Sequence, residues 1–159
     1  MRQRETYARA SLLDRLVDLE PQFPQEAHPL RAQTPRALRA SVRRDLEWLF
    51  NTRCPLPEAE LAQRQRSVID YGVMDFGTFF THNQEDFRRL AQHIEQTIDI
   101  YEPRLKESRV TVTLLRGSHR ALQVILDAQL IIDDINEPVS FPIIIDTKRG
   151  GEVKILSDD

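Results

Sequence analysis

The apolar residues of the chain recur with a helical period in its middle and alternate with polar residues towards its end. Over residues 34–50 they return every three or four positions, which predicts an amphipathic helix capped by Thr34 and begun by Pro35. A second apolar stripe predicts a helix over 83–101, which Pro103 ends because the residue before a proline avoids helical geometry. We expect both helices to belong to the core.

After these helices the apolar residues alternate with polar ones, which is typical of strands with one buried face. The alternation predicts strands over 110–114, 122–130, 139–146 and 152–156, with turns at 116–119 and at 136–138. Helices followed by hairpin-linked strands predict an α+β fold, in which N-terminal helices pack on one face of a C-terminal antiparallel or mixed β-sheet. Pro142 cannot donate to a ladder, so its strand is expected to be an edge or to be bulged there.

The N-terminal segment is expected to be separate from the main domain. We interpret residues 1–33 as a mobile arm that contains a short amphipathic helix and a proline-containing linker, and residues 34–159 as a single α+β domain. The short helix starts at Ser11, and its apolar side is formed by Leu12, Leu13, Leu16 and Val17. Because so short a helix is marginal alone, this side must dock either on the chain's own core or on a partner, and the sequence leaves both open.

Composition excludes several functional classes. With 30% charged residues and a formal net charge of -3, the chain has no global attraction to nucleic acid or to anionic lipid. The single cysteine, Cys54, cannot form an internal disulfide, and the apolar runs are too short to cross a bilayer. The basic start has no apolar run after it, so we expect no secretory signal and a cytoplasmic protein.

Catalytic chemistry has little support in the sequence. Glycoside hydrolysis needs two carboxylates, for which Glu102 and the pair Asp133 and Asp134 are candidates, but 25 acidic residues make such pairs common. The four histidines are scattered over separate elements, His93 is expected on the solvated side of its helix, and five glycines form no phosphate loop. We therefore expect no catalytic residue, metal or cofactor.

Two local features stand out. Gly72, in the turn-rich segment 67–76, is expected to adopt a backbone angle that other residues resist. The triplet Glu102, Pro103 and Arg104 places an acid and a guanidinium on either side of a rigid bend, so Arg104 can make a forked contact with a carboxylate of this chain or of another. A helix stop with a surface ion pair is the plainer interpretation of the triplet.

Five segments in order along the chain carry a resemblance to a known family. They are residues 11–16, 41–53, 67–76, 101–105 and 137–141. Together they resemble the TssE family, the small baseplate subunits of type VI secretion systems, which are related to the baseplate wedge proteins of contractile-tailed phages. Some members of that wider group carry a lysozyme-like label.

The resemblance implies a structural role without enzymatic activity. It implies contacts with the wedge proteins TssF and TssG and with TssK, a role in starting the sheath of TssB and TssC, and a place near the inner tube and spike. Six copies would surround a six-fold baseplate docked on the inner-membrane complex. In this family Glu102, Pro103 and Arg104 would belong to a motif tied to contacts with neighbouring wedge subunits.

Two further partner contacts follow as hypotheses. Leu12, Leu13 and Leu16 would form an amphipathic plug, and the strands that hold Ile143, Ile145 and Val153 would accept a strand from another chain. The alternatives are a peptidoglycan-cleaving, lysozyme-like glycosidase and a wedge protein of a phage tail or related injection particle. For the glycosidase Glu102 would be the acid, but Arg104 beside it favours the charged carboxylate, whereas a general acid must be protonated.

Overall fold

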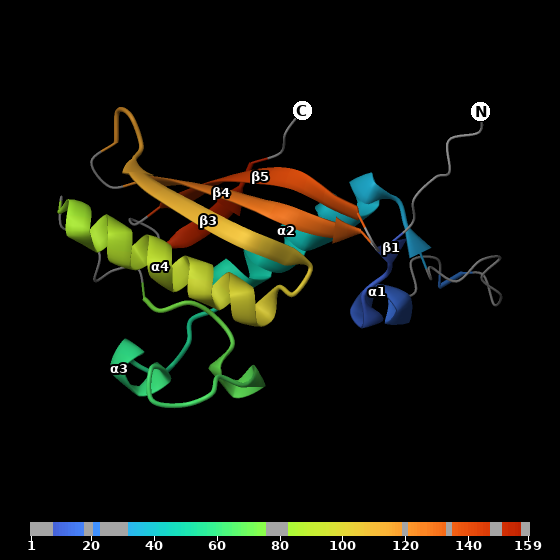
Figure 1. Ribbon diagram of the computed structural model, residues 1–159, viewed down its shortest axis with the longest axis horizontal. Helices are drawn as coiled ribbons and strands as arrows, with labels where there is room; N and C mark the ends of the chain where they lie inside the picture. The colour runs from blue at the N-terminus through green and yellow to red at the C-terminus, as the bar shows by residue number, and fades with distance from the viewer. Residues whose placement is uncertain are drawn as a thin grey trace.

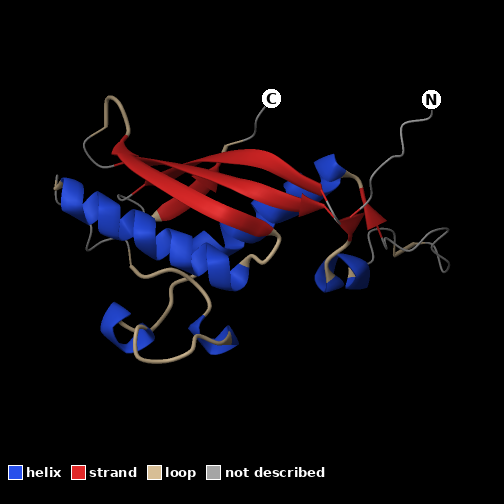
Figure 2. Cartoon of the chain, viewed as in Figure 1, coloured by secondary structure: helices blue, strands red, loops and turns tan. Residues whose placement is uncertain are grey.

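An antiparallel sheet and two long helices on one of its faces make up most of the computed structural model (Figures 1 and 2). It describes residues 8–17, 21–22, 32–75, 83–118, 121–132, 135–146 and 151–156, so the candidate pair Asp133 and Asp134 lies outside the described residues. The helices are α1 (Leu12–Leu16), α2 (Pro35–Asn51), α3 (Glu58–Leu61), the 3-10 helix η1 (Val68–Asp70) and α4 (Gln84–Tyr101). The strands are β1 (Ala8–Arg9), β2 (Ala32–Gln33), β3 (Leu105–Leu114), β4 (Ala121–Ile132), β5 (Ile135–Asp146) and β6 (Glu152–Ile155).

The four long strands follow one another in the sheet in the order β3-β4-β5-β6, and all three pairings are antiparallel. Alternate residues of each strand face α2 and α4 and form one apolar core with them, for example Val112, Leu126 and Phe141. The intervening residues are exposed, such as Thr111 and Asp127, or half-buried, such as Ile125. The predicted α+β fold, with helices on one face of an antiparallel sheet, is therefore confirmed.

Both long helices begin as the sequence predicts. Thr34 accepts a hydrogen bond from the N–H of Ala37 at 3.3 Å and Pro35 is the first helical residue, while Asn83 caps α4. Glu102 ends α4, since its N–H donates to the carbonyl of Ile98 at 2.8 Å. The predicted stop before Pro103 is thus confirmed.

The strands β3, β4 and β5 all extend beyond their predicted ranges. β3 starts at Leu105, and its pairing with β4 shifts register between Lys106 and Arg109, where Glu107 has a φ of 53°. This bulge breaks the alternation, which is why the pattern began only at residue 110. The turn predicted at 136–138 was wrong, because Pro138 pairs with Gln129 inside β5.

The expectation that His93 lies on the solvated side of its helix was wrong. Its side chain is 2% exposed rather than solvated, and its Nε2 accepts a hydrogen bond from the N–H of Met74 at 3.1 Å. α4 therefore packs on the segment before it as well as on the sheet. Burial, together with the nearby charge of Arg66, lowers the pKa of His93 to about 4.

Gly72 behaves as predicted. Its φ is +118°, and a Cβ at this position would lie 2.5 Å from the carbonyl oxygen of Thr52. The close approach allows Val73 to donate to Thr52 at 2.9 Å and Cys54 to donate to Val73 at 2.9 Å. These bonds attach the segment that carries η1 to the end of α2.

The N-terminal segment forms a small sheet of its own and contacts the main domain through Ala8, which belongs to the core cluster. β1 and β2 pair antiparallel, with Ala8 opposite Gln33, and Ala8 and Ala10 are buried. α1 is shorter than predicted, because Val17 already has an extended backbone. A domain boundary at residue 33 stays a prediction. Among the described residues, no helix has the length and apolarity that crossing a bilayer requires.

Candidate partner-binding site

The bend formed by Glu102, Pro103 and Arg104 is held by a forked contact inside this chain. Arg104 donates from Nε to Oε1 of Glu102 at 2.6 Å, and its Nη2 donates to the other oxygen of the same carboxylate. Glu102 is buried, with 3% of its surface exposed, whereas Pro103 is exposed. The carboxylate that Arg104 contacts with both nitrogens therefore belongs to Glu102 of this chain. The sequence alone had left open whether it would belong to this chain or to another.

Arg104 also contacts α2. Its Nη2 donates to Oδ2 of Asp45 at 2.6 Å, and its Nη1 donates to the hydroxyl of Ser41 at 3.2 Å. The hydrogen bonds and charges of Glu102 and Asp45 raise the pKa of Arg104 despite its burial, so the guanidinium stays charged at every accessible pH.

The contacts continue from Asp45 to α1. Oδ1 of Asp45 accepts from Nη2 of Arg44 at 2.9 Å, and Arg44 donates from Nη2 to Oδ1 of Asp14 at 2.7 Å. Glu102, Arg104, Asp45, Arg44 and Asp14 thus alternate in sign along one continuous row, which we call the ion-pair chain. It joins the end of α4 to α2 and α2 to α1.

Asp14 is the most connected member of the ion-pair chain. Its Oδ2 accepts from Ser11 at 2.8 Å, from Ser41 at 2.9 Å and from Gln33 at 3.2 Å, and the residue is 8% exposed. Burial by itself would raise the pKa of Asp14, but the hydrogen bonds from Ser11, Arg44 and Ser41 outweigh it and lower the pKa to about 2. Asp14 therefore fastens α1 to the domain as a charged group.

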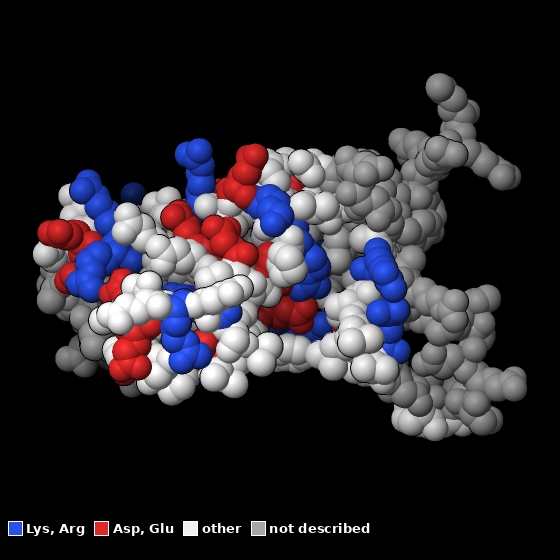
Figure 3. Space-filling model, turned by 60° about the horizontal axis from the view of Figure 1, so that its bottom comes forward, with Lys and Arg blue, Asp and Glu red and all other residues white. Residues whose placement is uncertain are grey.

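The charges on the face drawn in Figure 3 are mixed rather than gathered by sign. On the face drawn in Figure 3, Lys and Arg side chains lie among Asp and Glu side chains. A mixed face gives no strong field of one sign, so this face does not present the basic surface that nucleic acid attracts.

The apolar side of α1 points away from the described core. Leu12, Leu13, Leu16 and Val17 are between 48% and 72% exposed, while Asp14 of the same helix is buried. Of the two docking alternatives for this side, the structure does not show docking on the chain's own core. Docking on a partner stays a proposal.

The three strand residues predicted to bind a partner lie in the core instead of at an open edge. Ile143, Ile145 and Val153 are each 1% exposed. β5 is paired on both sides at Ile143 and Ile145, with β4 and with β6. Val153 exchanges two hydrogen bonds of 2.9 Å with the side-chain amide of Asn51. A role of these residues in binding stays a prediction. Their side chains are buried, and the backbone N–H and C=O of Val153 are already bound by Asn51, so neither is available to a partner.

Among the described residues, the candidate groups for catalysis are not brought together. Both carboxylate oxygens of Glu102 are bound by Arg104, and Cys54 is buried. Within the described part of the chain, no group of three or more His, Cys, Asp or Glu side chains could hold a metal ion.

Sequence reasoning identified Glu102 and Arg104 but missed Asp14, Ser41 and the pair Arg44 and Asp45. A signal was present, because residues 11–14 and 41–45 both contain a serine followed at the third or fourth position by an aspartate. Ser41, Arg44 and Asp45 also lie at i, i+3 and i+4 of α2, so they share one side of that helix.

Comparison with known proteins finds similar solved structures and a matching family. The chain is similar to a chain of the baseplate complex from the type VI secretion system, at 15% identity and a TM-score of 0.49, over 77% of this chain and 97% of that one. It is similar to a protein of Geobacter sulfurreducens provisionally assigned as a tail lysozyme, at 13% identity and a TM-score of 0.46, over 80% of this chain and 99% of that one. Identities this low do not indicate a shared function.

No curated protein matches the chain. The model of the family described as baseplate wedge protein gp25 matches residues 36–134, which run from α2 to the end of β4 and include most of the ion-pair chain. This match spans more than half of the 159 residues. The chain therefore belongs to the baseplate wedge protein gp25 family.

Proposed function

We propose that this baseplate wedge protein is the TssE-type subunit of a type VI secretion system, a structural part that joins the wedge complex and helps to start the contractile sheath. Family membership supports the baseplate role, and the order of the five sequence segments supports the secretion system. The observation that carries the mechanism is the ion-pair chain, which fixes the Glu102–Arg104 bend and holds α1 with its leucines outward.

The exposed side of α1 is the proposed contact with the wedge. A helix of five residues does not persist alone in water, so the bonds of Asp14 supply the order that the helix lacks. With Asp14 directed inward, Leu12, Leu13 and Leu16 are presented together on the outer side. Such a pre-ordered apolar side suits a hydrophobic groove of a partner, because little further ordering is needed on binding.

The partners proposed for this contact come from the resemblance. TssF and TssG would form the wedge around it, TssK, TssB and TssC would be neighbours, and the inner tube and spike would lie nearby. Six copies in a six-fold baseplate, on the cytoplasmic side of the inner-membrane complex, complete the proposal. It involves no nucleic acid and no insertion into the membrane.

The lysozyme-like alternative is disfavoured by the geometry of Glu102. A glycosidase acid must hold a proton near neutral pH, whereas this carboxylate accepts two hydrogen bonds from a guanidinium that stays charged. A wedge protein of a phage tail or related injection particle would share the fold and differ in its partners.

Co-expression with TssF and TssG, followed by sizing of the complex, tests the proposal. Leu13→Asp with Leu16→Asp should abolish the complex and leave the melting temperature within a few degrees of the parent, because both leucines are exposed. Ile100→Asp, at an exposed apolar position of α4, is the matched control and should assemble normally. An intact complex in the double variant contradicts the proposal, as does cell-wall hydrolysis that Glu102→Gln removes.

A further inference from the structure

An exposed helix side and an apolar groove lie at opposite ends of the described chain. On α1, Leu12, Leu13 and Leu16 are each at least half exposed and form what we call the leucine side. The groove, of about 450 Å³, lies between β3 and the first half of α4. Figure 1 shows α1 towards one end of the long axis and the start of α4 at the other. Because Asp14 fastens α1 in place, the leucine side cannot enter the groove of its own chain.

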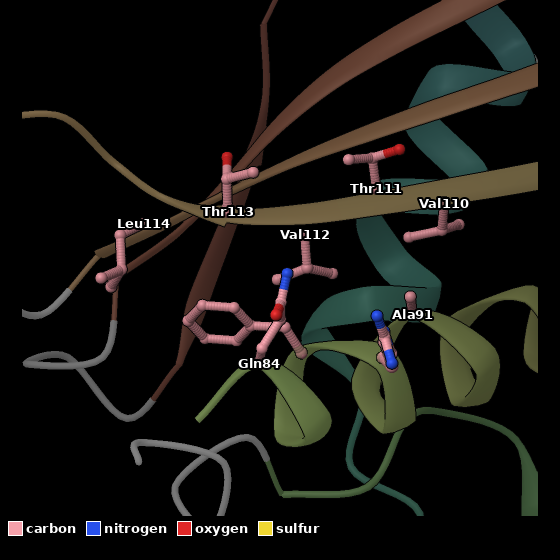
Figure 4. A pocket seen from close by; sticks show the side chains of 9 residues that line it. Gln84, Ala91, Val110, Thr111, Val112, Thr113 and Leu114 are labelled. Atoms are coloured by element: carbon pink, nitrogen blue, oxygen red, sulfur yellow. The ribbon is translucent and has the colours of Figure 1, made fainter. Parts of the chain in front are cut away.

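The β3–α4 groove is suited to apolar side chains. Its apolar lining comes from both elements and consists of Phe87, Ala91, Val110, Val112 and Leu114. Figure 4 shows Val110 and Val112 directed from β3 towards α4, whereas Thr111 and Thr113 are directed to the other side of the strand. The two α4 residues are only partly buried and Leu114 is exposed, so apolar surface in the groove is available to a bound group.

The groove is long enough for the leucine side. The five residues of α1 rise by about 7 Å, since an α-helix advances about 1.5 Å per residue. From Val110 to Leu114 the groove follows β3 for about 13 Å, at about 3.3 Å per residue. The short helix with its side chains therefore fits along the groove.

Ionic attraction does not favour contact between these two surfaces. Arg15 beside the leucine side and Arg88 on the α4 wall of the groove are both exposed and carry the same charge. Association of the surfaces must therefore be driven by the removal of apolar groups from water, which a salt such as sulfate strengthens. An ion-paired contact would instead be weakened by salt, so the two kinds of contact can be told apart.

We infer that the leucine side of one copy docks in the β3–α4 groove of a second copy, so that the free chain self-associates through unlike surfaces. Exposed apolar patches mark interaction sites, and this chain carries a projecting patch together with a recess that fits it. Unlike surfaces meet either twice in an antiparallel dimer or once per copy in an open chain, and both arrangements contain the same contact. The inference goes beyond the proposed function, because the wedge and a second copy would compete for the leucine side.

The area of the contact makes the association weak. The three leucines and Val17 remove roughly 400 Å² of apolar surface from water on docking, and the groove removes about as much. A total of roughly 800 Å² is below the size of stable interfaces. We expect a dissociation constant of about 0.1–1 mM, so the chain is mostly monomeric at about 10 µM.

Sedimentation equilibrium of the isolated full chain tests for the association. The average mass should rise from that of a monomer at about 10 µM towards at least twice that mass at about 2 mM. Sodium sulfate at about 0.5 M should strengthen the association. A chain that stays monomeric at about 2 mM, or an association that sulfate weakens, overturns the inference.

Two complementary variants locate the contact. Leu13→Asp with Leu16→Asp removes the leucine side and keeps the groove, whereas Ala91→Trp fills the groove and keeps the leucine side. Each variant alone should stay monomeric. Their equimolar mixture should form heterodimers and nothing larger, because one leucine side and one groove remain. A mixture that stays monomeric while the parent chain associates overturns the inference.

Leu114→Asp tests the groove without a change in the core, because Leu114 is exposed, and it should weaken self-association about tenfold. Leu156→Asp makes the same change at an exposed position outside the groove and is the matched control. Equal effects of the two variants overturn the inference even if Ala91→Trp fails to fold. A chain that self-associates but ignores TssF and TssG leaves the inference standing, and a monomeric chain that assembles with them leaves the proposed function standing.

Discussion

Arg44 lies 2.7 Å from Asp14, and this ion pair joins the central helix α2 to a short helix that precedes it by thirty positions in the chain. The pair is more than a surface contact, because Asp14 is buried and accepts three further hydrogen bonds from side chains. Through Asp45 it is continuous with the Glu102–Arg104 bend. The position of α1 and the geometry of the bend are thus parts of one network.

Replacement of Asp14 tests how firmly α1 is attached. Asp14→Ala removes the acceptor of Ser41 and one of the two carboxylates that Arg44 contacts, and we expect a loss of about 1–3 kcal/mol in the free energy of unfolding, limited because Arg44 is partly exposed and keeps Asp45. Hydrogen exchange should rise at residues 8–17 and not in α4. Glu58→Ala breaks the exposed pair with Arg89 and should change stability by less than about 1 kcal/mol. Equal effects of the two variants in urea titrations would contradict this account.

Arg104 should be more costly to remove than Arg44, since its side chain is 22% exposed against 40% for Arg44 and it makes a forked contact with a buried acid. Arg104→Ala leaves the carboxylate of Glu102 buried without a counter-charge, so a loss of about 3–5 kcal/mol is expected in urea denaturation. Arg104→Lys keeps the positive charge but cannot make two parallel hydrogen bonds to Glu102, and we expect it to lose less stability than Arg104→Ala. Recovery of stability in the double variant Arg104→Ala with Glu102→Gln would identify the unpaired charge as the cause.

The sequence predicted the elements that depend on local patterns. The stripe through Val42 and Leu46 marked α2, the cap at Thr34 marked its start, and strict alternation marked β4. Gly72 was identifiable because a glycine in a turn-rich segment commonly adopts a positive φ.

Features that depend on contacts between distant residues were not predictable in this way. His93 is buried because α4 packs on Met74 as well as on the sheet, which widens the buried side beyond one stripe. Residues 136–138 pair with β4 although their composition favours a turn, because Pro138 directs its missing donor away from β4. The ion-pair chain joins positions that lie 30 and 59 residues apart, so no local pattern reveals it.

His93 gives a testable dependence of stability on pH. Its pKa is about 4 in the folded chain and 6.5 in the unfolded chain, so between these values the unfolded chain binds more protons and stability falls as pH falls. This contribution is complete above pH 6.5 and is lost as pH falls through 4. Urea midpoints between pH 7.5 and 4.5 should therefore decline, and His93→Gln should flatten the decline. If the imidazole of His93 titrates near pH 6.5 in NMR spectra of the folded protein, this pH dependence cannot come from His93.

Asp14 adds a second dependence at lower pH. Its pKa is about 2 in the folded chain against an unperturbed value of 3.8, so its contribution is present above 3.8 and is lost as pH falls towards 2. We expect the segment around α1 to detach over this interval, seen as a rise in protease cleavage by pepsin within residues 8–17. Asp14→Asn should show that cleavage already at pH 4.

Gly72→Ala should destabilise the chain by about 2 kcal/mol or more, because the backbone has a φ of +118° and the new methyl group would meet the carbonyl of Thr52. Gly117→Ala is the matched control, since Gly117 also has a positive φ but has open space around its Cβ position. We expect that control to lose only about 1 kcal/mol in thermal denaturation. Similar losses would show that the contact between Gly72 and Thr52 is not what requires the glycine.

We expect Asn51 to protect the β6 edge of the sheet from pairing with another molecule. Asn51→Leu leaves the N–H and C=O of Val153 without partners and opens the β6 edge to pairing with another molecule. We expect self-association that grows with protein concentration, measured by light scattering after size exclusion, together with a loss of about 1–3 kcal/mol in stability. Asn51→Asp keeps an acceptor for the N–H of Val153 and should associate less. If Asn51→Leu stays monomeric while equally destabilised, the amide of Asn51 supports the fold without protecting the β6 edge from pairing.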